Sequence, residues 1–126
     1  MSKKATPRKL AKTEAGATLR TLRISPQKLN LIAGMIRGKH VSDALDHLMF
    51  SKKRSAKAVY DLVVSAISNA ENNHGLDMDN LYVAEAYVGK SLIMKRFMAR
   101  ARGRGSRIIK PFSRISVILR EQRDQA

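Results

Sequence analysis

The chain has 126 residues, 44% of them hydrophobic, which suffices for one domain around a single core and is too apolar for a disordered chain. It carries 25 Lys and Arg against 10 Asp and Glu, and a net charge of +15 indicates a polyanionic partner, foremost a nucleic acid. An anionic membrane surface is the weaker alternative, because no stretch forms a basic amphipathic helix with a strong apolar face.

Cysteine is absent, which excludes disulfides and thiolate metal sites. The N-terminal sequence lacks the apolar region of a secretory signal, and no run approaches the roughly 20 apolar residues of a membrane span. We therefore expect a cytoplasmic protein without a membrane span.

Residues 1–14 are strongly basic, which is typical of a flexible tail that is either solvated or finds an anion. Residues 15–23 (AGATLRTLR) predict a short strand, with Arg20 and Arg23 on its exposed face. We expect a single domain over residues 15–121 and a C-terminal tail at 122–126.

A first helix is predicted to start at Ser25-Pro26, because Ser caps helices and Pro suits their first position. Gly38 is the expected end of this helix. Its buried stripe, at helical spacing, is Leu29, Ile32, Ala33 and Ile36.

Two more helices are expected, one capped by Ser42 and ending near Phe50, and one capped by Ser51, spanning about 52–73 and ended by Gly75. The apolar face of the second helix is Ala44, Leu45, Leu48 and Met49. That of the third is Ala56, Val59, Val63, Ala66, Ile67 and Ala70.

The start of the third helix carries three successive cations, Lys52, Lys53 and Arg54. The positive end of the helix dipole disfavours cations in a first turn. A phosphate bound by these cations and the free N–H groups would explain them, and a solvated helix start is the plain alternative.

The acidic stretch 77–80 is predicted to be a turn, since Asp and Asn side chains hydrogen-bond their own backbone, and Mg²⁺ binding by Asp77 and Asp79 is the lesser alternative. Residues 81–88 and 114–120 alternate as strands do. With residues 15–23 they predict an α+β fold, in which a small three-stranded antiparallel sheet packs on three helices.

Between these two strands lies the most basic part of the chain, because residues 86–120 hold ten Lys and Arg and no Asp or Glu. A structureless connection of this length is improbable inside a compact domain. Extending both strands gives instead a long protruding β-hairpin over about residues 86–112, with its tip in residues 99–105; a shapeless basic loop is the alternative. Arginines of such an arm can bind phosphates, and Phe97 can stack on bases.

Three stretches carry a resemblance to a known family. The first reads Arg23-x-Ser25-Pro26-x-Lys28, followed by Ile36-Arg37-Gly38-Lys39-x-Val41. The second reads Asn69-Ala70-Glu71-Asn72-Asn73. The third combines Lys95, Arg100-Ala101-x-Gly103-Arg104 and Arg114-Ile115-x-Val117-x-Leu119. In these stretches the chain resembles the L-twenty-two family of bacterial large-subunit ribosomal proteins, from about residue 15 to residue 121. The family often has His where this chain has Arg114.

The resemblance implies a structural constituent of the large subunit that binds several domains of its ribosomal RNA, touches neighbouring subunit proteins and helps assembly. It also implies that the hairpin lines the polypeptide exit tunnel and meets the nascent polypeptide. Together with the charge pattern it predicts these RNA-binding residues: Lys28, Arg37, Lys39, Lys52, Lys53, Arg54, Lys90, Lys95, Arg96, Arg100, Arg102, Arg104, Arg107, Lys110 and Arg114. The residues expected to face the tunnel are Met94, Lys95, Arg96, Arg100 and Arg102.

Two other functions fit the sequence less well. An architectural DNA-binding protein with β-ribbon arms usually carries an apolar wedge at the tip, whereas this tip is rich in Arg, Gly and Ala. A nuclease is disfavoured because His40, His47 and His74 are scattered without a carboxylate at useful spacing. We expect no catalytic residue, no metal site and no cofactor.

Overall fold

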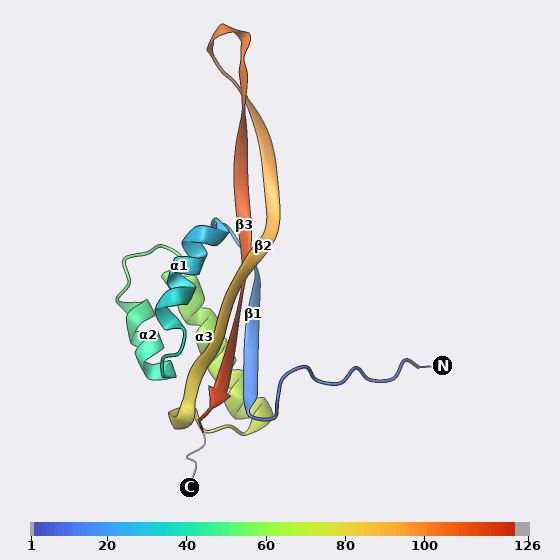
Figure 1. The fold of residues 1–126 in the computed structure, drawn as a ribbon, viewed down its shortest axis with the longest axis vertical. Coiled ribbons are helices and arrows are strands. Elements are labelled where there is room, and N and C mark those ends of the chain that lie inside the picture. Colours follow the sequence, from blue (N-terminus) through green and yellow to red (C-terminus); the bar gives the residue numbers. More distant parts are fainter. Residues whose placement is uncertain (1, 123–126) are drawn as a thin grey trace.

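The computed structural model describes residues 2–122, so Met1 and all but the first residue of the expected tail at 122–126 lie outside the described residues. Three α-helices and one three-stranded antiparallel sheet with a long protruding hairpin form the fold, and the predicted fold class is confirmed (Figure 1). The elements in chain order are β1 (Glu14–Leu22), α1 (Pro26–Ile36), α2 (Val41–Met49), α3 (Ala56–His74), η1 (Met78–Asn80), β2 (Leu81–Ala99), η2 (Ala101–Gly103) and β3 (Gly105–Glu121).

The sheet has the order β1-β3-β2, so the C-terminal strand lies in the middle and pairs antiparallel with both neighbours. Ile115, Val117 and Leu119 of β3 are fully buried, as their alternation predicted. Figure 1 shows the three helices gathered on one side of the sheet, which leaves the opposite face of the sheet without a helical cover.

The helices bury the apolar stripes that their periodicity indicated. All four predicted core residues of α1 and all six of α3 are buried. In α2, Ala44 and Leu48 are buried, but the prediction for Met49 is wrong, since 61% of this residue is exposed. Met49 is the last residue of α2, where the chain already turns away from the core.

Two predicted helix caps are wrong. α2 is capped by His40, whose Nδ1 accepts a hydrogen bond from the Ser42 N–H, so Ser42 lies inside the helix. α3 begins at Ala56 after Ser55, whereas the Ser51 hydroxyl accepts from the Lys53 N–H in a separate local turn. The cations of residues 52–54 therefore precede α3 and do not crowd its first turn.

The hairpin arm consists of the parts of β2 and β3 that extend past the other elements. β1 pairs with β3 only as far as Leu22 and Ser113, while β2 and β3 stay paired out to Ala99 and Gly105. None of residues 87–112 is buried. The 19 residues of β2 span about 60 Å at the usual rise of a strand, and Figure 1 shows the far half rising clear of the helices.

The tip of the arm is a tight turn. Arg102 and Gly103 both have positive φ, 62° and 68°, as in the type I′ turns that match the twist of a hairpin. The Arg100 N–H donates to the Arg104 carbonyl at 2.7 Å and closes the loop. Glycine adopts this conformation freely, whereas Arg102 does so at some energetic cost.

Candidate nucleic-acid interface

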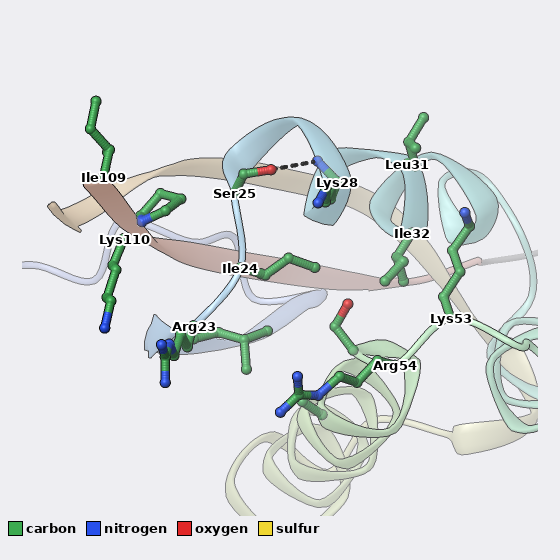
Figure 2. Close-up of a pocket in the computed structure, with 14 residues that line it drawn as sticks. Arg23, Ile24, Ser25, Lys28, Leu31, Ile32, Lys53, Arg54, Ile109 and Lys110 are labelled. Carbon is green, nitrogen blue, oxygen red and sulfur yellow. Dashed lines mark hydrogen bonds between the residues drawn. The ribbon is translucent and has the colours of Figure 1, made fainter. Parts of the chain in front are cut away.

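A groove of about 800 Å³ lies where the arm leaves the body, and it collects basic side chains from four segments. Arg23 comes from the link between β1 and α1, Lys28 from α1, Lys53 and Arg54 from the loop before α3, and Lys110 from β3 (Figure 2). Among residues 2–122, no Asp or Glu lines this groove. Five cations around one hollow repel one another unless an anion lies among them.

Apolar side chains line the same groove between the cations, among them Ile24, Leu31 and Ile109. Leu31 is 60% and Ile109 58% exposed, so these side chains do not serve the core. Figure 2 shows Ile24 and Ile32 in the middle of the hollow, with charged side chains around them. A basic rim over an apolar floor suits a phosphate backbone and the faces of its bases.

Two hydrogen bonds fix the backbone at the rim of this groove. Ser25 caps α1 through the Lys28 N–H at 3.4 Å, which fixes the first turn of α1 at the rim (Figure 2). The hydroxyl of the buried Ser113 donates to the Ile24 carbonyl at 2.5 Å and ties the link after β1 to the root of the arm. These two contacts hold the first turn of α1, which carries Lys28, and the link after β1, which carries Arg23.

Most of the other predicted RNA-binding residues lie in the arm, but they are divided between its two opposite faces. Strand alternation and the register put Met94 and Arg96 on one face, with Lys110 beside them, and Lys95 on the opposite face together with Arg107. Arg100, Arg102 and Arg104 surround the tip, and Lys90 lies exposed at the start of the arm opposite Ser113. The set expected to face the tunnel therefore does not share one face.

An irregularity in β2 sets these faces. The register between β2 and β3 shifts by one residue between Lys90 and Ile93. Such a bulge moves every following side chain of β2 to the other face. Near the tip, Phe97 is 76% exposed and its ring lies over Gly105, where a Cβ atom would approach the ring to 1.8 Å.

Four predicted residues lie outside both groove and arm. The Arg37 guanidinium donates from Nε to the Ala86 carbonyl (2.6 Å) and from Nη2 to Asn30 Oδ1 (2.7 Å), so it joins α1 to β2. Lys39 is half-buried beside β2, Lys52 is exposed in the loop before α3 without lining the groove, and Arg114 lies on the sheet face that no helix covers.

Sequence reasoning missed Arg23 as a member of the groove. Its exposure at the end of β1 was predicted, but its convergence with Lys110 depends on the antiparallel pairing of β1 and β3. The available signal was its position two residues before the Ser25 cap of α1, which puts it beside the first turn of that helix.

One ion pair lies far from the groove, at the other end of the sheet. Arg120 donates to Glu14 Oε1 from Nε at 2.9 Å and from Nη2 at 2.5 Å, across the register pair that joins β1 and β3. These hydrogen bonds lower the pKa of Glu14 and raise that of Arg120. It is the one salt bridge within residues 2–122, so the groove cations have no ion-pair partner there.

The acidic stretch is a turn, as predicted: Asp77 accepts from the Asp79 N–H at 3.0 Å and from the Asn80 amide at 3.0 Å. His40 is a capping residue whose Nε2 donates to the Asp79 carbonyl at 2.6 Å. Over residues 2–122 no group of three or more His, Cys, Asp or Glu is arranged to hold a metal ion. No helix in that range is long and apolar enough to cross a membrane.

A family model described as ribosomal protein L22p/L17e matches residues 17–120. The chain belongs to this family. Three relatives, each named large ribosomal subunit protein uL22, match over 126 residues and the whole of this chain. The protein of Phenylobacterium zucineum is 63% identical to this chain, and the match covers 100% of its length. The protein of Methylorubrum populi is 59% identical, with 99% of its length covered. The protein of Maricaulis maris is 57% identical, with 100% of its length covered.

Membership in the L22p/L17e family confirms the resemblance drawn from the three sequence stretches. The chain is a ribosomal protein and not an enzyme, and as a component of bacterial-type ribosomes it belongs to the cytoplasm. One of the family stretches has a structural role here, because the Asn69 amide donates to the Gly16 carbonyl at 3.2 Å and joins α3 to β1.

Proposed function

We propose that this protein is a structural constituent of the large ribosomal subunit that binds large-subunit ribosomal RNA through the groove and the arm. The observation that carries the proposal is the groove, where five cations from four segments converge and no carboxylate of residues 2–122 joins them. An isolated domain gains no stability from such an arrangement, whereas a phosphate backbone neutralises it.

The arm extends the same interaction. Residues 90–107 add seven Lys and Arg and no acidic residue, on a ribbon with no buried residue of its own. Two strands alone are marginal in water. Packing between RNA segments would cover its exposed apolar side chains, of which Leu92, Phe97 and Ile109 are more than half exposed. A body bound at one RNA segment and an arm bound at others would join them, which is how the protein would assist subunit assembly.

The family relationship supports a direction for the arm, along the wall of the polypeptide exit tunnel. One face would then contact RNA and the other the passing nascent polypeptide. Met94 and Arg96 share one face of the arm, and Lys95 lies on the opposite face. Either Met94 and Arg96 or Lys95 would therefore meet the polypeptide, but not all three. Neighbouring large-subunit proteins would contact the remaining surface of the body.

The test is the binding of the purified chain to a large-subunit ribosomal RNA transcript, with duplex DNA of equal length as competitor. We expect the complex to survive excess DNA. The variant Lys28→Gln should lower the slope of log affinity against log salt by about 0.7–0.9, which corresponds to one phosphate contact. Lys57→Gln is the matched control, since Lys57 is also an exposed helical lysine but lies outside the groove.

Displacement of the RNA by DNA would refute the proposal in favour of the architectural DNA-binding alternative. Equal slopes for Lys28→Gln and Lys57→Gln would show that the groove is not the site and that net charge alone drives binding.

A further inference from the structure

A second hollow, of about 450 Å³, lies on the face of the sheet that the helices leave uncovered. β1 contributes Thr18 and Arg20, β2 contributes Tyr87, Val88 and Gly89, and β3 contributes Arg114 and Ser116. Apart from Val88, these residues share one face by alternation, since Leu19, Val88 and Ile115 pack into or against the core. The hollow is distinct from the groove, whose lining it does not share.

Gly89 lies in this hollow, just before the bulge between Lys90 and Ile93. Its φ is not positive, so its backbone would accept any residue, and a Cβ atom added there would meet nothing within 4 Å. Glycine inside a strand weakens the strand, and it often marks a bulge or a place where a ligand approaches the backbone closely. The space beside Gly89 is therefore open for an external group.

The groups around Gly89 define the chemistry of that external group. Arg20 and Arg114 lie on adjacent strands, and no Asp or Glu of the described part of the chain lines the hollow. Tyr87 is 54% exposed, and Gly89 leaves the space next to it empty. The hydroxyls of Thr18 and Ser116 hydrogen-bond each other at 3.0 Å and keep the polar floor of the hollow satisfied.

We propose that this hollow is a second RNA site, in which an unpaired base stacks on Tyr87 over Gly89 while its phosphate lies between Arg20 and Arg114. The inference rests on the proposed function, because it takes RNA as the partner. An unpaired nucleotide is favoured over a duplex, since only a splayed base offers its flat face to an aromatic ring.

Beyond Gly89 and Arg114 this face continues into the root of the arm, where β2 and β3 stay paired. In the other direction Glu85, exposed on the same face, sets the limit of the cationic surface. A strand of RNA bound at Tyr87 would thus run toward the arm and away from Glu85.

Intrinsic fluorescence provides a site-specific test, because the chain has three tyrosines and no tryptophan. Tyr60 and Tyr82 are half-buried and do not line the hollow, whereas Tyr87 is exposed in it. We expect a short single-stranded oligouridylate to quench the tyrosine emission of the full-length chain and an RNA duplex of the same length to quench it far less. Tyr87→Leu should abolish the quenching, whereas the control Tyr60→Phe should keep it.

A second variant separates binding from stability. Gly89→Val should shift the midpoint of the quenching titration to about 10-fold higher oligouridylate concentration, because its side chain fills the space for the base. The thermal unfolding midpoint of this variant should stay equal or rise, since Val suits a strand better than Gly. Glu85→Gln, a change on the same face outside the hollow, should leave the titration unchanged or tighten it.

Quenching that persists in Tyr87→Leu, or a Gly89→Val titration equal to the wild type, would overturn the inference. If either occurs while the chain still binds large-subunit RNA through Lys28, the second site is wrong and the proposed function stands. If the chain binds neither oligouridylate nor large-subunit RNA, both are wrong.

Discussion

Removing the arm is the perturbation that separates the two parts of the protein most cleanly. Lys90 and Ser113 are direct partners across β2 and β3, at the point where the pairing of β1 ends. Replacing residues 91–112 by Asn-Gly would join them through a two-residue hairpin turn, for which Asn-Gly is the preferred sequence.

The structure gives the expected magnitude. The 22 buried hydrophobic residues found within residues 2–122 all lie outside residues 91–112, and the deleted ribbon is marginal on its own. We expect the free energy of unfolding to change by less than about 1 kcal/mol, out of the 5–15 kcal/mol of a typical domain. The deletion removes seven Lys and Arg, so the salt slope of RNA binding should fall by about 5 to 6 if each contacts a phosphate.

The assay is urea and thermal unfolding followed by circular dichroism, together with RNA binding over a range of salt. A shift of the thermal midpoint within about 8 °C would match the expected change for a domain of this size. Loss of the cooperative transition would refute the reasoning, because it would mean that the arm is part of the folded core. An unchanged salt slope would refute the assignment of the arm to RNA.

Three smaller changes test other contacts. Glu14→Gln should lower the free energy of unfolding by up to about 1 kcal/mol at neutral pH. Because Arg120 lowers the pKa of Glu14, the stability difference between the two chains is fully present above the ordinary carboxyl pKa. It should vanish in acid as the pH falls through the lowered pKa of Glu14. A difference that persists in acid would contradict this origin. Arg102→Asn should leave the tip intact, since Asn tolerates positive φ, and lower the salt slope by about 0.7–0.9; an unchanged slope would place Arg102 off the RNA. Gly105→Ala should displace the ring of Phe97, visible as a change in its proton NMR shifts, whereas unchanged shifts would mean that the ring does not rest on the glycine.

Hydrophobic periodicity was sufficient to predict those helices and strands that have one face in the core. The stripe of α1 and the alternation of β3 at Ile115, Val117 and Leu119 were readable because burial selects one apolar residue at each turn or every second position. Helix starts were less readable, because several polar residues near α2 and α3 can cap a helix. His40 caps α2 in place of Ser42, since its second ring nitrogen also reaches the Asp79 carbonyl.

The sites depend on features that no local pattern contains. The groove forms only when strand pairing brings Arg23 to the root of the arm beside Lys110. The two faces of the arm depend on the bulge between Lys90 and Ile93, and an exposed ribbon has no buried side whose alternation would reveal it. For the same reason the sequence suggested that Met94 and Lys95 act together, although they lie on opposite faces.

Photo-crosslinking in assembled large ribosomal subunits tests the central claim most directly. A benzophenone amino acid would replace Leu31 in the groove or Phe97 on the arm, and the crosslinks would be mapped on the RNA by reverse transcription. The proposal predicts that both positions crosslink to defined nucleotides of large-subunit RNA, in different segments. Crosslinks from Leu31 to protein alone, or no RNA crosslink from either position, would contradict it.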